Sequence, residues 1–386
     1  MHQQKTDMLS VKNANRALIL QCLRRRHISR IDISKETNLS KAAVTILTND
    51  MVKEGLLKEN GVDETLAVTV GRRPILLGIV PDYRFAVGVG LHRKRIAVNL
   101  VNLELQQLDL AETCLASFRY PDQAVEWICS HIKSLVAKHE LDWDKCVGIG
   151  VSSPGPLDYK NGIILNPPNF EMFANYPITE RLTAQLGKPV SLENNSVVLA
   201  ITDYLCNSLE PFSQVMFITA MEGIGTAILS RGKVMRGFAG FAGELGHSSV
   251  DINGIPCSCG NKGCLEQYVT LAALRQRFNF ESYVKLVDDA YSGYGYALNI
   301  IAFVAEYLGC AIASASNILD LDAVVLHGDF NYRPEMLLDR IKKIVSDRSV
   351  ICRTHPIAFH ASCLGPESVD VANAVGVINS FFSQQY

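Results

Sequence analysis

The chain has 386 residues, which is too long for one ordinary domain and suits two or three. Its 48% hydrophobic and 20% charged residues describe a globular protein, and we find no uninterrupted apolar run long enough to cross a bilayer. The start, MHQQKTDMLS, lacks the apolar core of a signal peptide. The lack of a long apolar run predicts no association with a membrane. The eleven cysteines are scattered and odd in number, which favours a reducing cytoplasm with one metal cluster over a disulfide framework.

The net charge of -2 hides an asymmetry along the chain. Residues 1–80 contain 13 Lys or Arg and 8 Asp or Glu, whereas the remainder contains 24 and 31. A basic front end on an acidic body predicts an N-terminal module that meets a polyanion.

The front end, residues 1–80, reads as three helices followed by a two-stranded wing. Residues 11–26 have helical apolar spacing, Ser29 can cap a second helix, and Ser40 can cap a third over 41–54 that Gly55 ends. Residues 56–59 and 66–70 then read as a strand and its return strand. This order predicts a winged helix-turn-helix domain.

The third helix is the predicted reading helix, because its outward residues are small or polar and would let it enter a major groove. Two arginines in the following GRRP turn could reach a minor groove or the backbone. The predicted DNA contacts are Ser40, Lys41, Ala42, Ala43, Thr45, Thr48, Asn49, Arg72 and Arg73. The alternative is a small helical protein-interaction module with a charged linker.

From about residue 81 onward, strands and helices alternate, and polar loops follow the strands, which predicts an α/β body of two lobes. We expect a first lobe over 81–195, with the C-terminal helix 368–386 packing back on it, and a second lobe over 196–367. The expected strands are 85–103 (two, joined by a turn), 105–110, 146–151, 190–192, 215–219, 226–229 and 323–326. The expected helices are 122–139, 178–186, 196–205, 300–319 and 368–382.

Residues 244–266 hold four soft metal ligands, which are His247, Cys257, Cys259 and Cys264. Three thiolates and one imidazole form a closed tetrahedral set for a structural zinc ion. Nearby glycines let the backbone turn sharply enough for close-spaced cysteines to reach one ion. Three buried free thiols, or a disulfide, are the alternatives. The same segment carries Glu244 and Glu266, which could either bind a polyhydroxylated ligand or be solvated surface charges.

Several of these motifs together resemble the ROK family, named for repressors, open reading frames and sugar kinases. The carrying segments are GVSSPG at 150–155, ENN at 193–195, GIG at 223–225, ELGH at 244–247 and CSCGNKGCLE at 257–266. The resemblance covers essentially the whole chain, and the winged front end with its GRRP exit resembles the regulator branch, which includes xylose and N-acetylglucosamine repressors. It implies an actin-like (ribonuclease H-like) sugar-kinase fold behind a winged helix.

The resemblance also implies site residues. The implied sugar contacts are Ser153, Gly155, Asn194, Asn195, Glu244, His247 and Glu266, and the implied zinc ligands are the four already given. His247 would then serve twice, with one ring nitrogen on zinc and the other toward a sugar hydroxyl.

The family's kinase residues are missing. Where family kinases carry a metal-holding aspartate in the first phosphate loop, this chain has Gly90, followed by His92 and Arg93 in place of small residues. Asn195 stands where kinases place the aspartate that acts as general base, and such bases contribute about 100- to 10,000-fold in rate. His327 replaces a glycine of the nucleotide turn.

We therefore expect a cytoplasmic, sugar-responsive DNA-binding regulator, most simply a repressor of carbohydrate-utilisation genes, that is not an enzyme. Its expected partners are operator DNA, a sugar or sugar derivative as effector, and further copies of itself in a homodimer or homotetramer. The alternatives are an active sugar kinase with a DNA-binding head and a zinc-braced protein-interaction adaptor.

Overall fold

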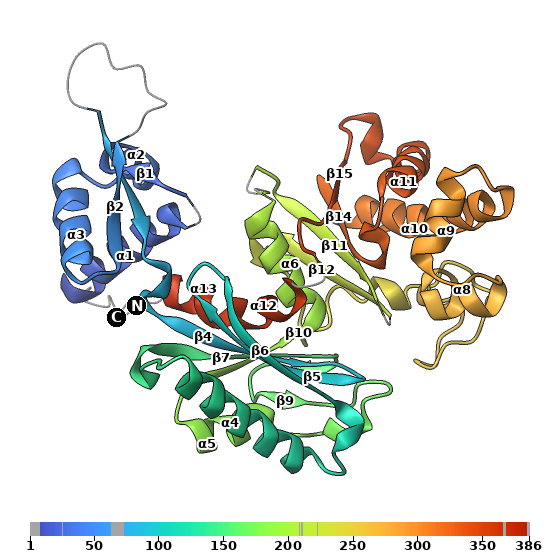
Figure 1. Cartoon of the computed structure of the whole chain (residues 1–386). Helices are drawn as coiled ribbons and strands as arrows, with labels where there is room; N and C mark the ends of the chain where they lie inside the picture. The colour runs from blue at the N-terminus through green and yellow to red at the C-terminus, as the bar shows by residue number, and fades with distance from the viewer. Residues whose placement is uncertain are drawn as a thin grey trace, which may run out of the picture. The chain divides into compact units, whose positions relative to one another are not determined.

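The computed structural model describes residues 8–24, 26–62, 73–207, 209, 211–221, 223–365 and 368–383. These residues form two compact units, shown with the whole chain in Figure 1. The first unit comprises 1–152, 177–192 and 373–386, and the second comprises 153–176 and 193–372. Segment 153–176, expected in the first lobe, therefore packs with the second unit, whereas 373–386 packs with the first.

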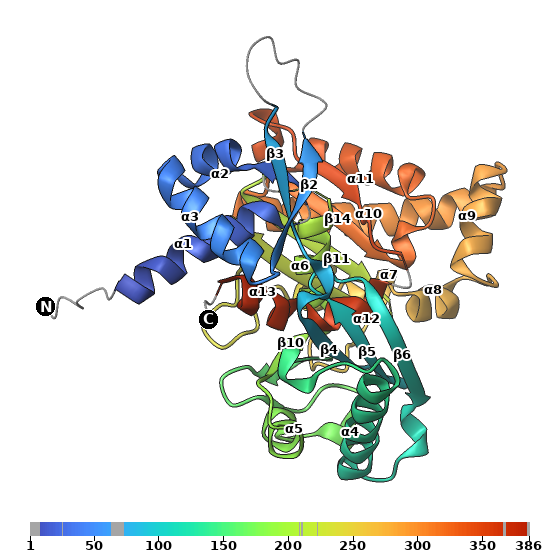
Figure 2. The ribbon, with the colours of Figure 1, turned by 60° about the vertical axis from the view of Figure 1, so that its left-hand side comes forward.

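The winged helix-turn-helix is present at the start of the first unit. Its helices are α1 (Met8–Leu23), α2 (Arg30–Thr37) and α3 (Lys41–Lys53), and its strands are β1 (Ile28–Ser29), β2 (Leu57–Val62) and β3 (Ile75–Ile79). Ser29 and Ser40 cap α2 and α3 as expected, since their hydroxyls accept hydrogen bonds from the amides of Asp32 and Ala43. Figure 2 shows α2 and α3 beside the β2–β3 ribbon.

The wing differs from the prediction in its strand pairing. The strands pair in the order β1-β3-β2, so β2 pairs with β3, the segment that follows the GRRP turn. The expected return strand 66–70 lies outside the described residues. Strand β3 was not predicted, because the proline-containing segment before it was interpreted as the exit from the domain.

The rest of the first unit is a five-stranded sheet with helices on both faces. Its strands pair in the order β10-β7-β4-β5-β6. They are β4 (Phe85–Leu91), β5 (Arg95–Asn102), β6 (Gln107–Cys114), β7 (Cys146–Ser153) and β10 (Val190–Asn194). Helices α4 (Pro121–Lys138) and α5 (Ile178–Leu186) cover one face, and α13 (Val375–Ser383) covers the other (Figure 1). The expected single helix 368–382 is divided into α12 (Ser368–Val371), a 3-10 turn (Ala372–Ala374) and α13.

The second unit is built on a second five-stranded sheet, ordered β13-β12-β11-β14-β15. Its strands are β11 (Gln214–Ala220), β12 (Ile224–Ser230), β13 (Lys233–Val234), β14 (Ala323–Gly328) and β15 (Ala358–Ala361). A separate hairpin of β8 (Leu157–Asp158) and β9 (Ile163–Ile164) precedes them. Alternate strand residues enter two cores: Phe217 and Val325 pack with α6 (Asn195–Cys206), whereas Ile218 and Leu326 pack with the helices of the opposite face.

The helices of that opposite face are α7 (Glu266–Val269), α8 (Leu271–Arg277), α9 (Tyr283–Tyr291), α10 (Gly295–Leu319) and α11 (Glu335–Arg348). Helix α10 is long and apolar enough to cross a membrane by length and composition, although Asn299 and Glu306 interrupt its apolar sequence. In this structure its residues Ile301, Val304 and Leu308 are buried in the core of the second unit.

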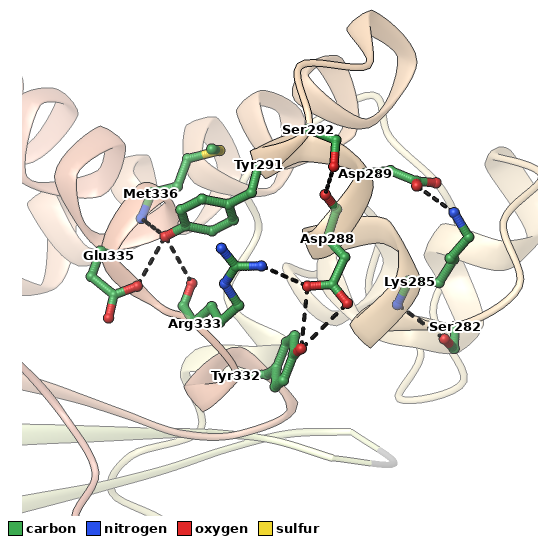
Figure 3. A network of polar contacts seen from close by, with 10 residues as sticks. All are labelled: Ser282, Lys285, Asp288, Asp289, Tyr291, Ser292, Tyr332, Arg333, Glu335 and Met336. Carbon is green, nitrogen blue, oxygen red and sulfur yellow. Dashed lines mark hydrogen bonds and ion pairs between the residues drawn. The ribbon is translucent and has the colours of Figure 1, made fainter.

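A surface network fixes α9 to the segment before α11 (Figure 3). Arg333 donates to Asp288 at 2.7 Å, and its guanidinium lies over the ring of Tyr291 at 3.8 Å from the centroid. The hydroxyl of Tyr291 donates to Glu335 at 2.9 Å. These contacts join helices that are more than 40 residues apart in the chain.

Candidate functional site

The four predicted metal ligands lie together in the second unit. One ligand atom from each of His247, Cys257, Cys259 and Cys264 can be chosen so that all four are within 4.8 Å of one another. Cys257 Sγ is 3.8 Å from His247 Nδ1, and Cys259 Sγ is 3.6 Å from Cys264 Sγ. A set of three sulfurs and one imidazole nitrogen at this spacing could hold a tetrahedral metal ion.

Tight backbone turns place these ligands. The short helix η5 (Leu245–His247) presses so closely on β12 that a Cβ at Gly246 would lie 2.5 Å from the carbonyl oxygen of Ile224. Gly263 has a φ of +68°, and a Cβ there would lie 1.7 Å from the carbonyl oxygen of Asp251. A side chain at either position would push His247 or Cys264 away from the group.

The protonation of the cysteines reflects their burial. Burial raises the pKa of the Cys264 thiol to about 12 and also raises the pKa of Cys257, whereas the Asn261 backbone amide lowers the pKa of Cys259. A metal ion binds thiolates, so its binding would release these protons.

Two of the residues expected to bind sugar, Glu244 and Glu266, lie beside His247 of the metal-ligand group, and a third, Asn194, lies at the start of α6. Asn194 caps α6, because its Oδ1 accepts a hydrogen bond from the Ser196 amide at 2.8 Å. This contact leaves the amide nitrogen of Asn194 facing the 154–156 loop, where a Cβ at Gly155 would be 2.8 Å from Nδ2. At the β11–β12 turn, a Cβ at Gly223 would be 3.8 Å from Glu266 Oε2, and one at Gly225 only 1.8 Å from Ser196 Oγ.

Glu266, a predicted sugar contact, touches two of the predicted metal ligands. Its Oε1 lies 3.5 Å from His247 Nδ1 and 3.2 Å from Cys257 Sγ. Glu244 is exposed, yet desolvation by the surrounding protein raises the pKa of its carboxyl. The nearby His247 opposes this increase in the pKa, and the charge of Glu266 adds to it. An amide donor, two carboxylate acceptors and an imidazole on rigid turns form a set of groups that matches a polyhydroxylated ligand. We call Asn194, Glu244, His247 and Glu266 the candidate sugar site.

Of the three other predicted sugar contacts, Gly155 lies beside Asn194 as described above, and Ser153 and Asn195 have different surroundings. Ser153 is fully buried, and its hydroxyl donates to the carbonyl oxygen of Pro154 at 3.2 Å. Asn195 is half-buried as the first residue of α6. Their roles in sugar binding remain predictions.

The outward face of α3 is largely as predicted, with one error. Lys41, Ala42, Thr45 and Asn49 are exposed, Ser40 is the exposed cap, and Ala43 is half-buried. Thr48 is wrong as a DNA contact, because it is fully buried. Its hydroxyl donates to the Val44 carbonyl at 2.8 Å and accepts from Arg30 at 3.0 Å.

Ile46 was not among the predicted DNA contacts, yet it is 62% exposed on the same face as Thr45 and Asn49. Helical spacing could have found it, since Val44, Leu47, Thr48 and Met51 form the buried stripe and leave position 46 outside. Its apolar side chain suits contact with a thymine methyl group. Of the two predicted turn arginines, Arg73 is exposed, and Arg72 lies outside the described residues.

The glycine at position 90, where family kinases carry an aspartate, has a structural explanation. A Cβ at Gly90 would lie 2.6 Å from Asn373 Nδ2 and 2.9 Å from His92 Nε2, so these side chains fill the space that an aspartate would need. Asn373 is itself held by the Ser152 hydroxyl at 2.6 Å. His327 is 4% exposed at the end of β14, and burial lowers the pKa of its imidazole, although the charge of Asp203 opposes this.

A comparison with known proteins matches the model of the ROK family to residues 86–377. Among curated relatives, a putative xylose repressor of Caldicellulosiruptor sp. (strain Rt8B.4) is 28% identical over 373 residues and covers 92% of both chains. The DNA-binding transcriptional dual regulator NagC of Escherichia coli (strain K12) is 28% identical over 345 residues, covering 84% of this chain and 82% of its own.

Solved structures share the fold. A ROK family transcriptional regulator described as a homologue of the E. coli MLC protein has a TM-score of 0.80 at 22% identity and covers 97% of both chains. A ROK family glucokinase from Streptomyces griseus, solved with glucose and AMPPNP, has a TM-score of 0.62 at 24% identity. It covers 75% of this chain and 98% of its own, so the kinase likeness leaves a quarter of this chain unmatched. The predicted fold class, a winged helix-turn-helix joined to a sugar-kinase-like α/β body, is confirmed.

Proposed function

The chain belongs to the ROK family, and we propose that it is a sugar-responsive transcriptional regulator, acting as a repressor of carbohydrate-utilisation genes in the cytoplasm. The observation that carries this proposal is that one chain joins a winged helix-turn-helix, with an exposed reading face on α3, to a candidate sugar site braced by a metal-ligand group. Relatives named as a xylose repressor and an N-acetylglucosamine repressor, matched over 97% and 82% of their own lengths, support it.

On the DNA side, α3 would enter a major groove with Lys41, Ala42, Thr45, Ile46 and Asn49 toward the bases. Ser40 and Lys41 lie at the N-terminus of the helix, where exposed amides and the helix dipole favour phosphate. Arg72 and Arg73 would add contacts from the turn after the wing. A homodimer or homotetramer would place two such helices on two half-sites.

On the sugar side, Asn194 would donate to a hydroxyl, while Glu244 and Glu266 would accept from others, with Ser153, Gly155 and Asn195 lining the same site. His247 would hold a structural zinc ion through Nδ1, together with Cys257, Cys259 and Cys264, and would present its other ring nitrogen to the sugar. The zinc ion would fix the position of the His247 ring. Bound sugar changes DNA affinity only if it binds one conformation of the protein more tightly than another.

We propose further that the protein does not phosphorylate its effector. The side chain of Asn373 fills the space beside Gly90, and Asn195 is a neutral amide that cannot take a proton from the sugar at a useful rate. The competing function, a sugar kinase with a DNA-binding head, predicts ATP-dependent phosphorylation that is lost when Glu244 is replaced. No turnover with any sugar that binds would support the regulator.

The direct test selects DNA fragments from a random pool with the full-length, zinc-loaded protein and then titrates sugars into the complex. We expect a two-fold symmetric recognition sequence, release by one sugar class, and loss of that release in Asn194→Ala. Salt dependence separates DNA binding from an adaptor role, since log Kd should change with log salt by about 0.9 per phosphate neutralised. Robust DNA binding that no sugar changes would refute the sensor half of the proposal.

A further inference from the structure

A glycine-rich loop, residues 236–243, leads directly into Glu244 of the candidate sugar site; we call it the Phe238 loop. Its base is closed by a hydrogen bond from the Ala242 amide to the Arg236 carbonyl at 3.2 Å. Gly237, Gly240 and Gly243 have φ values of +69°, +87° and +100°, which favour glycine at all three positions. The sequence therefore builds a narrow loop that is fixed at both ends.

The Phe238 loop is held against residues that adjoin Asn194. The Arg236 guanidinium forms a two-pronged ion pair with Glu193, with one N–O distance of 3.2 Å, and lies over the Tyr159 ring at 4.8 Å from the centroid. The same Glu193 carboxylate accepts a hydrogen bond from the backbone amide of Asn194 at 2.9 Å. A Cβ at Gly240 would be 2.6 Å from the ring of Tyr159, so the far side of the loop also rests on that ring.

The loop nevertheless presents its largest apolar side chain to solvent. Phe238 is as exposed as a free side chain, at 109%, and Phe241 is 45% exposed. Met221, two residues before Gly223 at the β11–β12 turn, is 40% exposed. Exposed apolar side chains in a loop that leads into a polar site indicate a ligand-binding surface.

The Phe238 loop is linked to the candidate sugar site through Arg236. Phe238 is two residues from Arg236, so their Cα atoms are at most about 7 Å apart. The head group of Arg236 already touches the residue that precedes Asn194. A ligand that extends one further sugar ring beyond the first could reach Phe238, and a pyranose or furanose ring offers an apolar C–H face that an aromatic ring can cover.

We infer that Phe238 forms an outer subsite and that the effector class is a glycoside or oligosaccharide with at least two rings, rather than a free monosaccharide. This inference rests on the proposed sugar site. Asn194, Glu244, His247 and Glu266 hold the terminal ring, and Phe238 stacks on the next ring. Arg236 is a positioning residue, because it fixes the loop through Glu193 and Tyr159.

Calorimetric titration of the full-length, zinc-loaded protein tests the inference with two matched sugar pairs: xylose with xylobiose, and N-acetylglucosamine with its β-1,4-linked dimer. In the pair that binds, we expect the disaccharide to bind about threefold to tenfold more tightly than the monosaccharide, as an aromatic contact would give. Phe238→Ala should abolish that difference and leave monosaccharide affinity unchanged. Phe238→Tyr should keep it, and Ile318→Ala, at another highly exposed apolar position, on α10, should change neither affinity.

Each outcome has one meaning. Equal affinities of both pair members, unaffected by Phe238→Ala, would overturn the outer subsite while leaving the proposed sugar site intact. Equal weakening of both members by Phe238→Ala would also overturn it, because the loop would then act as a lid over the first ring. Absence of binding by all four sugars would refute the proposed sugar site and this inference together.

Discussion

Two positions on α3, only two residues apart, should behave in opposite ways when mutated. Ile46 is 62% exposed, whereas Thr48 is fully buried and hydrogen-bonded to Arg30 and Val44. Full burial of an isoleucine side chain is worth about 1.5–3 kcal/mol, so covering the exposed share of Ile46 against DNA is worth about 1–2 kcal/mol. That energy corresponds to a roughly fivefold to thirtyfold change in Kd.

We therefore expect Ile46→Ala to weaken binding to the selected DNA by roughly that factor while changing the free energy of unfolding by less than about 0.5 kcal/mol. Thr48→Ala, the matched control, removes a buried hydroxyl and should lower stability by about 1–2 kcal/mol with little effect on the affinity of the folded protein. Fluorescence anisotropy with labelled DNA and chemical denaturation measure the two quantities. Wild-type DNA affinity in Ile46→Ala, or lost affinity in a fully folded Thr48→Ala, would show that the reading face of α3 is assigned wrongly.

Three further predictions concern the second unit. Cys259→Ser should reduce bound zinc from one ion per chain to none and lower the thermal unfolding midpoint, because structural zinc sites supply about 10–16 kcal/mol of apparent binding energy. An unchanged midpoint after chelation of the wild-type protein would contradict a structural role for zinc. Gly225→Ala should lower the free energy of unfolding by about 1–3 kcal/mol, because the new Cβ would lie 1.8 Å from Ser196 Oγ. Adding Ser196→Gly should restore most of that free energy in a double-mutant cycle, whereas additive losses would exclude the clash as the cause. Burial lowers the pKa of His327 in the folded chain below the ordinary 6.5, so the unfolded chain binds more protons and stability should fall as pH decreases below about 6.5. The denaturation midpoint of His327→Leu should depend less steeply on pH in that range, and equal slopes for both proteins would exclude His327 as the source.

Patterns that repeat within a few residues could be predicted from the sequence. The caps at Ser29 and Ser40 were found because a hydroxyl, a helical stripe and the following polar turn lie next to one another in the chain. The four metal ligands were found because three of them fall within eight residues, 257–264, among glycines.

Features that depend on distant partners were not found. The wing strand β3 is defined by its pairing with both β1 and β2, and its sequence, ILLGI, follows a proline that suggested a linker. Thr48 looked suitable for DNA because threonine is polar, yet Arg30, 18 residues away, supplies the hydrogen bond that allows its burial. Local sequence carries no sign of Asn373 beside Gly90, since 283 positions separate them.

The way the backbone threads the molecule also limits how the protein can be taken apart. The chain passes between the two units four times, at 152–153, 176–177, 192–193 and 372–373. No single cut can release either unit as one continuous polypeptide, so truncation is a poor route to studying the sensor in isolation. The DNA-reading module, by contrast, is continuous and has one covalent link to the body, after β3, so gene fusion could exchange it in a single recombination event. The incoming module would have to replace the contacts that Arg24, directly after α1, makes with Asn379 and Phe382 of α13.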